Sequence, residues 1–105
     1  MEEYTELIKI QHLINERDLS MGHCVMLPEG ILHLHTHEPS EIYQIISGTA
    51  EFYLDGVSEI LTEGDIRYIP SGYSHGIGNV GTDDLKFNWI FPYGPWSNIE
   101  YRWLE

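Results

Sequence analysis

Apolar residues fall in short runs along most of the chain, and turn-forming residues separate these runs. The runs are rich in β-branched and aromatic residues, a composition typical of strands. Asp55-Gly56, between two of the runs, is a strong signal for a tight hairpin. The turns recur about every eight to twelve residues, which is the spacing of a β-sandwich or barrel. The pattern predicts strands over residues 21–27, 31–37, 41–46, 49–54, 57–61, 65–69, 75–80 and 85–91.

The secondary structure of the two ends of the chain is harder to predict. In the first ten residues, Leu7, Ile8 and Ile10 fit a single helical turn and a strand about equally well. The tail from Pro92 onward is too aromatic for a disordered end. We expect it to fold back over the domain or to pair with a second subunit. Its aromatic residues are Tyr93, Trp96, Tyr101 and Trp103.

The length and composition fit one globular domain. The chain has 105 residues, so we expect a single domain over 1–105, with a barrel core over residues 20–91. Apolar residues make up 42% and charged residues 21%, which argues against disorder. Antiparallel strands must protect their edges, and closure into a small barrel creates an interior for one small ligand. The sequence therefore predicts an all-β barrel.

The charge balance excludes several kinds of partner. The chain has 5 basic and 17 acidic residues and a net charge of -12, which disfavours nucleic acids and anionic membranes. No apolar run is long enough to span a bilayer. The acidic start lacks the layout of a signal peptide, so we expect a cytoplasmic protein. The single cysteine, Cys24, excludes an intramolecular disulfide and a multi-thiolate zinc site.

Histidines are the unusual feature, since four of the six lie between positions 23 and 37. His33, His35 and His37 alternate with other residues, so on a strand they are expected to share one face. Residues two apart are about 7 Å apart along a strand, and imidazoles at that spacing can converge on a metal ion. Glu41 can complete the same site, and His75 is the fourth candidate. A His-x-His pair is also common on exposed strands, so this pattern alone is a weak indication.

Two longer segments make the indication specific. In the first, His35-Thr36-His37 is followed after three residues by Glu41 and after six more by Gly48. In the second, the spacing is Gly64, five residues, Pro70, one, Gly72, two, His75, three, Asn79. Together the segments resemble the paired signatures of the cupin superfamily over residues 30–79. One departure is that four residues, not five, separate Gly30 from His35.

The resemblance implies a double-stranded β-helix, which is a small jelly-roll barrel, with short N- and C-terminal extensions. The metal ligands of the family correspond to His35, His37, Glu41 and His75, all of which are present. It also implies one divalent transition metal ion. Imidazole and carboxylate ligands bind Mn, Fe, Ni, Zn and Co, so the ligand types do not identify the metal.

These four ligands fit several functions. They leave two positions open on a six-coordinate ion, where a substrate with two adjacent oxygens can bind. We therefore expect a metal-dependent enzyme acting on a small oxygenated substrate, with isomerase, lyase and dioxygenase chemistry all open. The alternative is a non-catalytic protein that binds a carboxylate, a sugar or a hormone-like ligand.

Strand alternation gives the candidates for catalysis. Tyr43 is expected to face the same way as Glu41, and His33 lies one step beyond the ligands; both are candidate catalytic residues. Core packing for Tyr43 and an exposed strand position for His33 are the alternatives. Arg67 can hold a carboxylate or pair with Glu51 or Glu63. Because a small barrel has sheet edges to cover, we also expect a homodimer.

Overall fold

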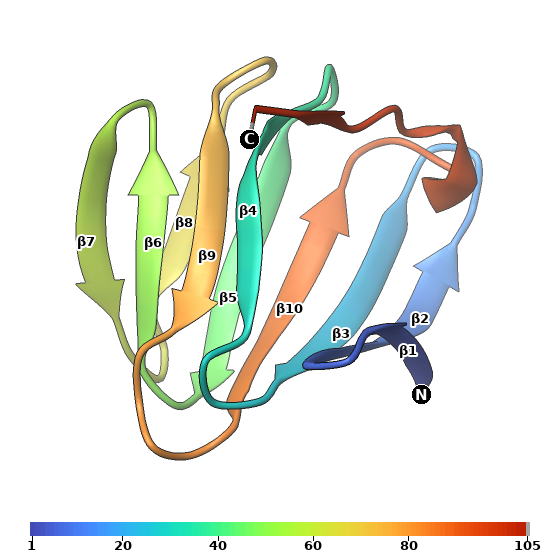
Figure 1. Ribbon diagram of the computed structural model, residues 1–105. Coiled ribbons are helices and arrows are strands. Elements are labelled where there is room, and N and C mark those ends of the chain that lie inside the picture. The colour runs from blue at the N-terminus through green and yellow to red at the C-terminus, as the bar shows by residue number, and fades with distance from the viewer. Residues whose placement is uncertain (105) are drawn as a thin grey trace.

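The computed structural model describes residues 1–104, which form eleven strands and one short 3-10 helix (Figure 1). The strands are β1 (Glu2–Thr5), β2 (Ile8–Asn15), β3 (Ser20–Met26), β4 (Ile31–Thr36), β5 (Glu41–Ser47), β6 (Ala50–Leu54), β7 (Val57–Leu61), β8 (Ile66–Ile69), β9 (His75–Asn79), β10 (Leu85–Phe91) and β11 (Arg102–Trp103). The 3-10 helix η1 covers Trp96–Asn98. Within the described residues no helix is long and apolar enough to cross a membrane.

Two antiparallel sheets form the molecule. The six-stranded sheet has the order β1-β2-β3-β10-β5-β8, and the five-stranded sheet has the order β11-β4-β9-β6-β7. β5 and β10 are neighbours although they are far apart in the sequence, as are β4 and β9. The sheets face each other across the core, which is the jelly-roll arrangement that the resemblance implies (Figure 1).

The core lies between the sheets and explains the alternation along each strand. In β3 and β10, and in β5 as far as Ile45, every second residue is buried, while the residues between them are half-buried or exposed. Phe52 of β6 and Phe87 of β10 are among the largest buried side chains. Gly48, directly after β5, has a φ of 94°, and a Cβ there would lie 2.7 Å from the carbonyl oxygen of Asp84. Glycine is therefore required where the chain turns between the sheets.

The eight predicted strands correspond to β3–β10, with ends that differ by one residue at most. The first ten residues, which fitted two structures equally well, form β1 and the start of β2. The tail folds back over the barrel, and β11 extends the five-stranded sheet beside β4. The predicted single domain spans 1–105, of which position 105 lies outside the described residues.

Candidate metal centre

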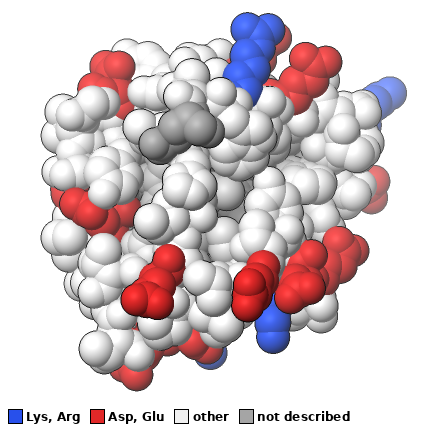
Figure 2. All heavy atoms as spheres, in the orientation of Figure 1, with Lys and Arg blue, Asp and Glu red and all other residues white. Residues whose placement is uncertain are grey.

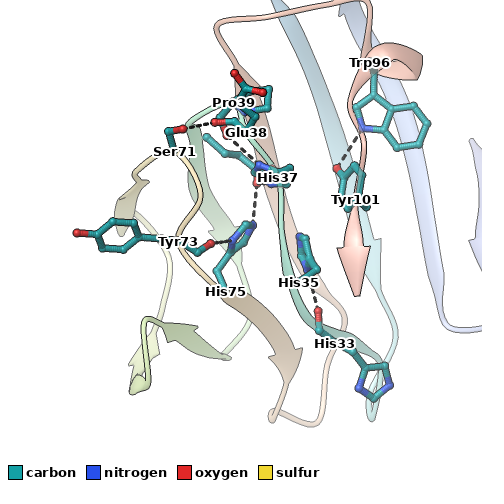
Figure 3. Close-up of polar contacts among 11 residues, drawn as sticks. His33, His35, His37, Glu38, Pro39, Ser71, Tyr73, His75, Trp96 and Tyr101 are labelled. Carbon is teal, nitrogen blue, oxygen red and sulfur yellow. Dashed lines mark hydrogen bonds and ion pairs between the residues drawn. The ribbon is translucent and has the colours of Figure 1, made fainter. Parts of the chain in front are cut away.

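Three histidines converge at one end of the barrel (Figure 3). His35 lies near the end of β4, His37 follows that strand directly, and His75 begins β9. All three side chains are buried, and each has a ring nitrogen within 4.8 Å of a ring nitrogen of the other two. The geometry is that of a group that can hold one metal ion.

Strand pairing and one tight turn bring the histidines together. His35 and His75 are cross-strand partners in the β4–β9 ladder, and their ring centroids lie 4.2 Å apart. The turn before β9 is held against β4 because the backbone N–H of Gly72 donates to the carbonyl oxygen of His37 at 3.0 Å. Gly72 has a φ of 77°, a conformation that glycine adopts without strain. The two segments that resemble the cupin signatures are therefore adjacent in space.

Backbone carbonyl groups determine which ring nitrogen carries the proton in all three histidines. The Nδ1 atoms of His35, His37 and His75 lie 2.8, 2.8 and 2.9 Å from the carbonyl oxygens of residues 33, 39 and 73. A carbonyl oxygen only accepts hydrogen bonds, so each Nδ1 carries the proton. In the neutral ring, Nε2 then presents a lone pair. Metal-binding histidines are commonly oriented by such contacts on the second nitrogen.

Glu41, the first residue of β5, points its carboxylate at these lone pairs. Its Oε1 atom lies 3.1 Å from Nε2 of His37 and 3.2 Å from Nε2 of His75. A carboxylate and an unprotonated Nε2 are both acceptors, so they attract each other only through a shared proton or a cation. Within residues 1–104, Nε2 of His35 is buried without a hydrogen-bond partner. A cation among the four side chains satisfies every one of these atoms, and the residues therefore fit a divalent metal ion.

Burial also favours the neutral form of the His35 ring. Burial lowers the pKa of His35 to about 4, and the neighbouring His75 adds to this effect. The ring is therefore neutral at physiological pH, which is the form that binds metal.

A small cavity of about 40 Å³ lies inside the barrel, with Glu41 in its wall. This volume holds only a few water molecules. Its wall is mostly apolar and aromatic, and none of the described residues that line it is Lys or Arg. In the face that Figure 2 shows, charged side chains likewise lie mainly around the margin. The lining residues are Tyr4, Ile8, Ile10, Cys24, Met26, Leu32, Glu41, Tyr43, Phe87, Trp89, Trp96 and Tyr101.

Two tyrosines of this wall lie close to the histidines. The Tyr43 ring is 6.1 Å from that of His75, and the Tyr101 ring stacks on His35 at 5.1 Å. Burial raises the pKa of both hydroxyls well above the usual value, and the charge of Glu41 raises it further. Both phenols therefore stay protonated at physiological pH and can donate hydrogen bonds to a ligand.

Tyr101 was not expected in the site, because it belongs to the tail. The Trp96 indole N–H donates to its hydroxyl oxygen at 3.3 Å, which leaves the Tyr101 proton available for another acceptor (Figure 3). β11 pairs with Thr36 and His35, so the tail closes over the histidines. Outside, an open hollow of about 720 Å³ reaches His37 between the tail and the turn at 71–72, and Arg102 is in its wall. Only the aromatic composition of the tail hinted at this role.

His33 does not share the face of the other two histidines. The register of the β4–β9 ladder shifts between Leu32 and His35, so Leu32 packs on the core and His33 is exposed. Figure 3 shows its ring pointing away from the cluster. The expectation of three aligned histidines is therefore wrong, because simple alternation does not continue through a β-bulge. The carbonyl group of His33, rather than its ring, supports the centre.

Arg67 lies away from the cavity as well. Its guanidinium donates two hydrogen bonds to Glu59, at 2.8 and 3.0 Å. This exposed pair connects β8 of one sheet to β7 of the other, and the expected partners Glu51 and Glu63 are not used. The cavity therefore has no arginine to neutralise an anion.

A comparison with known protein families agrees with the fold and the cluster. The family model described as the cupin domain matches residues 22–91. The chain belongs to the cupin family. The match runs from within β3 to the end of β10 and includes all four candidate ligands.

Individual relatives are also similar to this cupin. An oxalate-binding protein from Thermotoga maritima is 39% identical over 61 residues, and the match covers 57% of this chain and 50% of that protein. The chain thus spans half the length of this relative. A crystal structure of a predicted oxalate decarboxylase from Thermotoga maritima has a TM-score of 0.78 and 29% identity, over 80% of this chain and 78% of that one. KdgF from Halomonas sp., at 22% identity and a TM-score of 0.79 over 87% and 84% of the two chains, is similar in fold.

Proposed function

We propose that this cupin binds one divalent transition metal ion through His35, His37, Glu41 and His75 and binds a small carboxylate on that ion. One observation carries the proposal. Two of the three histidine Nε2 atoms directly face the Glu41 carboxylate, and the third is buried without a partner. A buried set of acceptors is unfavourable unless a cation or a shared proton lies among them, and one divalent ion contacts all four side chains at once.

The charge of the loaded centre favours an anionic ligand. A divalent ion with one carboxylate and three neutral imidazoles has a net charge of +1. Such an ion supplies a Lewis acid with open positions for two adjacent oxygens. Among residues 1–104 the cavity wall contains no Lys or Arg, so the ion is the main attraction for a carboxylate.

The size of the cavity favours a very small ligand. A cavity of about 40 Å³ is better suited to a two-carbon dicarboxylate than to a sugar. Tyr43 and Tyr101 can each donate to a ligand oxygen. The oxalate-binding protein that this chain resembles makes oxalate the appropriate probe.

Titration calorimetry tests the proposal. Protein loaded with Mn, Fe, Co, Ni or Zn and metal-stripped protein would each be titrated with oxalate, and with acetate as a one-carboxylate control. We expect oxalate to bind the loaded protein and to leave the stripped protein unchanged, with acetate much weaker. Equal binding of oxalate by both forms would contradict the proposal.

Catalysis is the second candidate, and the position of Tyr43 favours it. Its phenol shares the cavity wall with Glu41, so it can donate a proton to a ligand held there. The exposed position of His33 makes it unsuited to this role, although its part in catalysis stays a prediction. Incubation of the loaded protein with oxalate and small hydroxy acids, followed by product analysis and oxygen uptake, tests turnover. Unchanged substrates with every metal would leave binding as the function.

A further inference from the structure

Trp96, the first residue of η1, contacts the phenol of Tyr101, which in turn stacks on His35 (Figure 3). The indole N–H of Trp96 lies 3.3 Å from the Tyr101 hydroxyl oxygen. An indole N–H can only donate a hydrogen bond, so the hydroxyl oxygen is the acceptor and its own proton points elsewhere. Trp96 therefore acts on the direction of the Tyr101 proton and not on the metal centre itself.

The Tyr101 hydroxyl has a proton to donate and no protein group to receive it. Burial, and after it the charge of Glu41, raises the pKa of this phenol well above its usual value, so the proton stays on the oxygen. Within residues 1–104 the hydroxyl donates to no acceptor. Tyr101 and Trp96 both line the cavity that has Glu41 in its wall. A ligand oxygen in this cavity would supply the acceptor that the phenol lacks.

Trp96 is itself held in place by two strands of the six-stranded sheet. Its backbone N–H donates to the side-chain oxygen of Asn15, at the end of β2, at 2.8 Å. Its ring packs on those of His12 in β2 and Trp89 in β10, at centroid distances of 5.1 and 6.1 Å. The fold therefore sets the direction of the indole N–H before a ligand binds, which lowers the entropic cost of a precise contact.

A glycine makes room for this support. Gly22 of β3 is the cross-strand partner of both His12 and Trp89. A Cβ at Gly22 would overlap the Trp89 ring, so the indole can lie against β3 only because this residue has no side chain. A larger residue would displace Trp89 and with it the surface on which Trp96 packs. The support of the tail thus depends on a residue of the barrel wall.

We propose that Trp96 is a positioning residue for ligand recognition, because its indole N–H directs the hydroxyl proton of Tyr101 toward a carboxylate oxygen in the cavity. The inference rests on the proposed function, since it needs a carboxylate bound at the metal centre. An oxalate ion that binds a metal through two oxygens keeps two further oxygens as acceptors. Hydrogen bonds to charged oxygens are strong but depend on direction, so the orientation of the phenol decides how much it contributes.

Calorimetry with oxalate on the metal-loaded protein tests the proposal through a cycle of variants. Trp96→Phe keeps an aromatic ring but removes the N–H, and is expected to weaken oxalate binding about fivefold with unchanged metal content. On a Tyr101→Phe background the same substitution is expected to leave the affinity unchanged, because the hydroxyl through which it acts is already absent. An equal loss on both backgrounds would show a merely structural role of the indole and would overturn the proposal.

Trp103→Phe is the matched control. Trp103 belongs to the same tail, and its ring stacks on that of Tyr101 at a centroid distance of 5.8 Å. In the part of the chain that the structure describes, it makes no hydrogen bond to the phenol. The variant keeps the stacking, so its oxalate affinity is expected to equal that of the wild type. A loss as large as that of Trp96→Phe would contradict a specific role of the Trp96 N–H.

Asn15→Ala keeps the test decisive if Trp96→Phe does not fold. Asn15 is exposed, and the substitution removes the acceptor of the Trp96 backbone N–H without altering the cavity wall. We expect oxalate binding to weaken at least about twofold, again only where the Tyr101 hydroxyl is present. Unchanged affinity of these folded variants would overturn this inference alone. A wild-type protein that does not bind oxalate would overturn the proposed function and this inference with it.

Discussion

Nε2 of His75 lies 3.2 Å from Oε1 of Glu41, although the Nδ1 of the same ring already donates to the carbonyl oxygen of Tyr73. Two acceptors at this distance need a cation or a proton between them. His37 contacts the same Oε1 atom at 3.1 Å. This relationship is the main support for the proposed metal centre.

Glu41→Gln is expected to have opposite effects on stability and metal binding. The glutamine amide can donate to the Nε2 lone pairs, so the metal-free variant should be about 1 kcal/mol more stable than the wild type. Its metal affinity should fall at least about tenfold, because a neutral ligand replaces a charged one. Thermal unfolding of stripped protein at mildly alkaline pH and competition with a metal chelator provide the two measurements. A variant that is less stable without metal would count against the acceptor cluster.

His75→Ala is expected to remove most of the bound metal while the fold is retained. The substitution deletes one of the three proposed nitrogen ligands but leaves the hydrophobic core between the sheets intact. Metal content by elemental analysis, with circular dichroism for the fold, checks this expectation. His33→Ala is the matched control, because its exposed ring points away from the cluster and its carbonyl is unaffected. Full metal content in the His75 variant would refute its assignment as a ligand.

Tyr101→Phe is expected to weaken oxalate binding about tenfold, the effect of losing one hydrogen bond to a charged group. The ring still stacks on His35, so the metal content should stay the same. Calorimetry with oxalate and elemental analysis separate the two effects. Tyr53→Phe is the control, since its hydroxyl donates to Glu51 outside the cavity. Equal affinities of the Tyr101 variant and the wild type would exclude the phenol as a donor to the ligand.

The stability of the metal-free protein should fall as the pH is lowered from about 6.5 to about 4. The pKa of His35 is about 4 in the folded protein and near 6.5 in the unfolded chain. Between these values the unfolded state binds more protons, so the free energy of unfolding rises with pH and levels off above the unfolded value. The full effect is about 3 kcal/mol. Urea unfolding across this range measures it, and His35→Gln should remove most of the slope.

Much of the fold could be predicted from the sequence because its turns are explicit. Asp55-Gly56 and Gly48 mark chain reversals that few other residues permit, and β3–β10 follow from the runs between such positions. The grouping of His35, His37 and His75 was likewise expected from the resemblance of the two segments to the cupin signatures. Local sequence is informative where it determines a turn or a repeated spacing.

The remaining features depend on tertiary structure. The bulge that exposes His33 arises from the pairing of β4 with β9, which the local pattern does not show. The position of Tyr101 over His35 depends on how the tail returns to the barrel. Arg67 pairs with Glu59 because the edges of two sheets meet there. The cytoplasmic location and the homodimer stay predictions.

A crystal structure of the metal-loaded protein, with anomalous scattering recorded at the absorption edge of the bound metal, tests the central claim most directly. We predict one strong anomalous peak about 2.0–2.3 Å from Nε2 of His35, His37 and His75 and from a carboxylate oxygen of Glu41. A peak located elsewhere, or none in crystals soaked with each candidate metal, would contradict it.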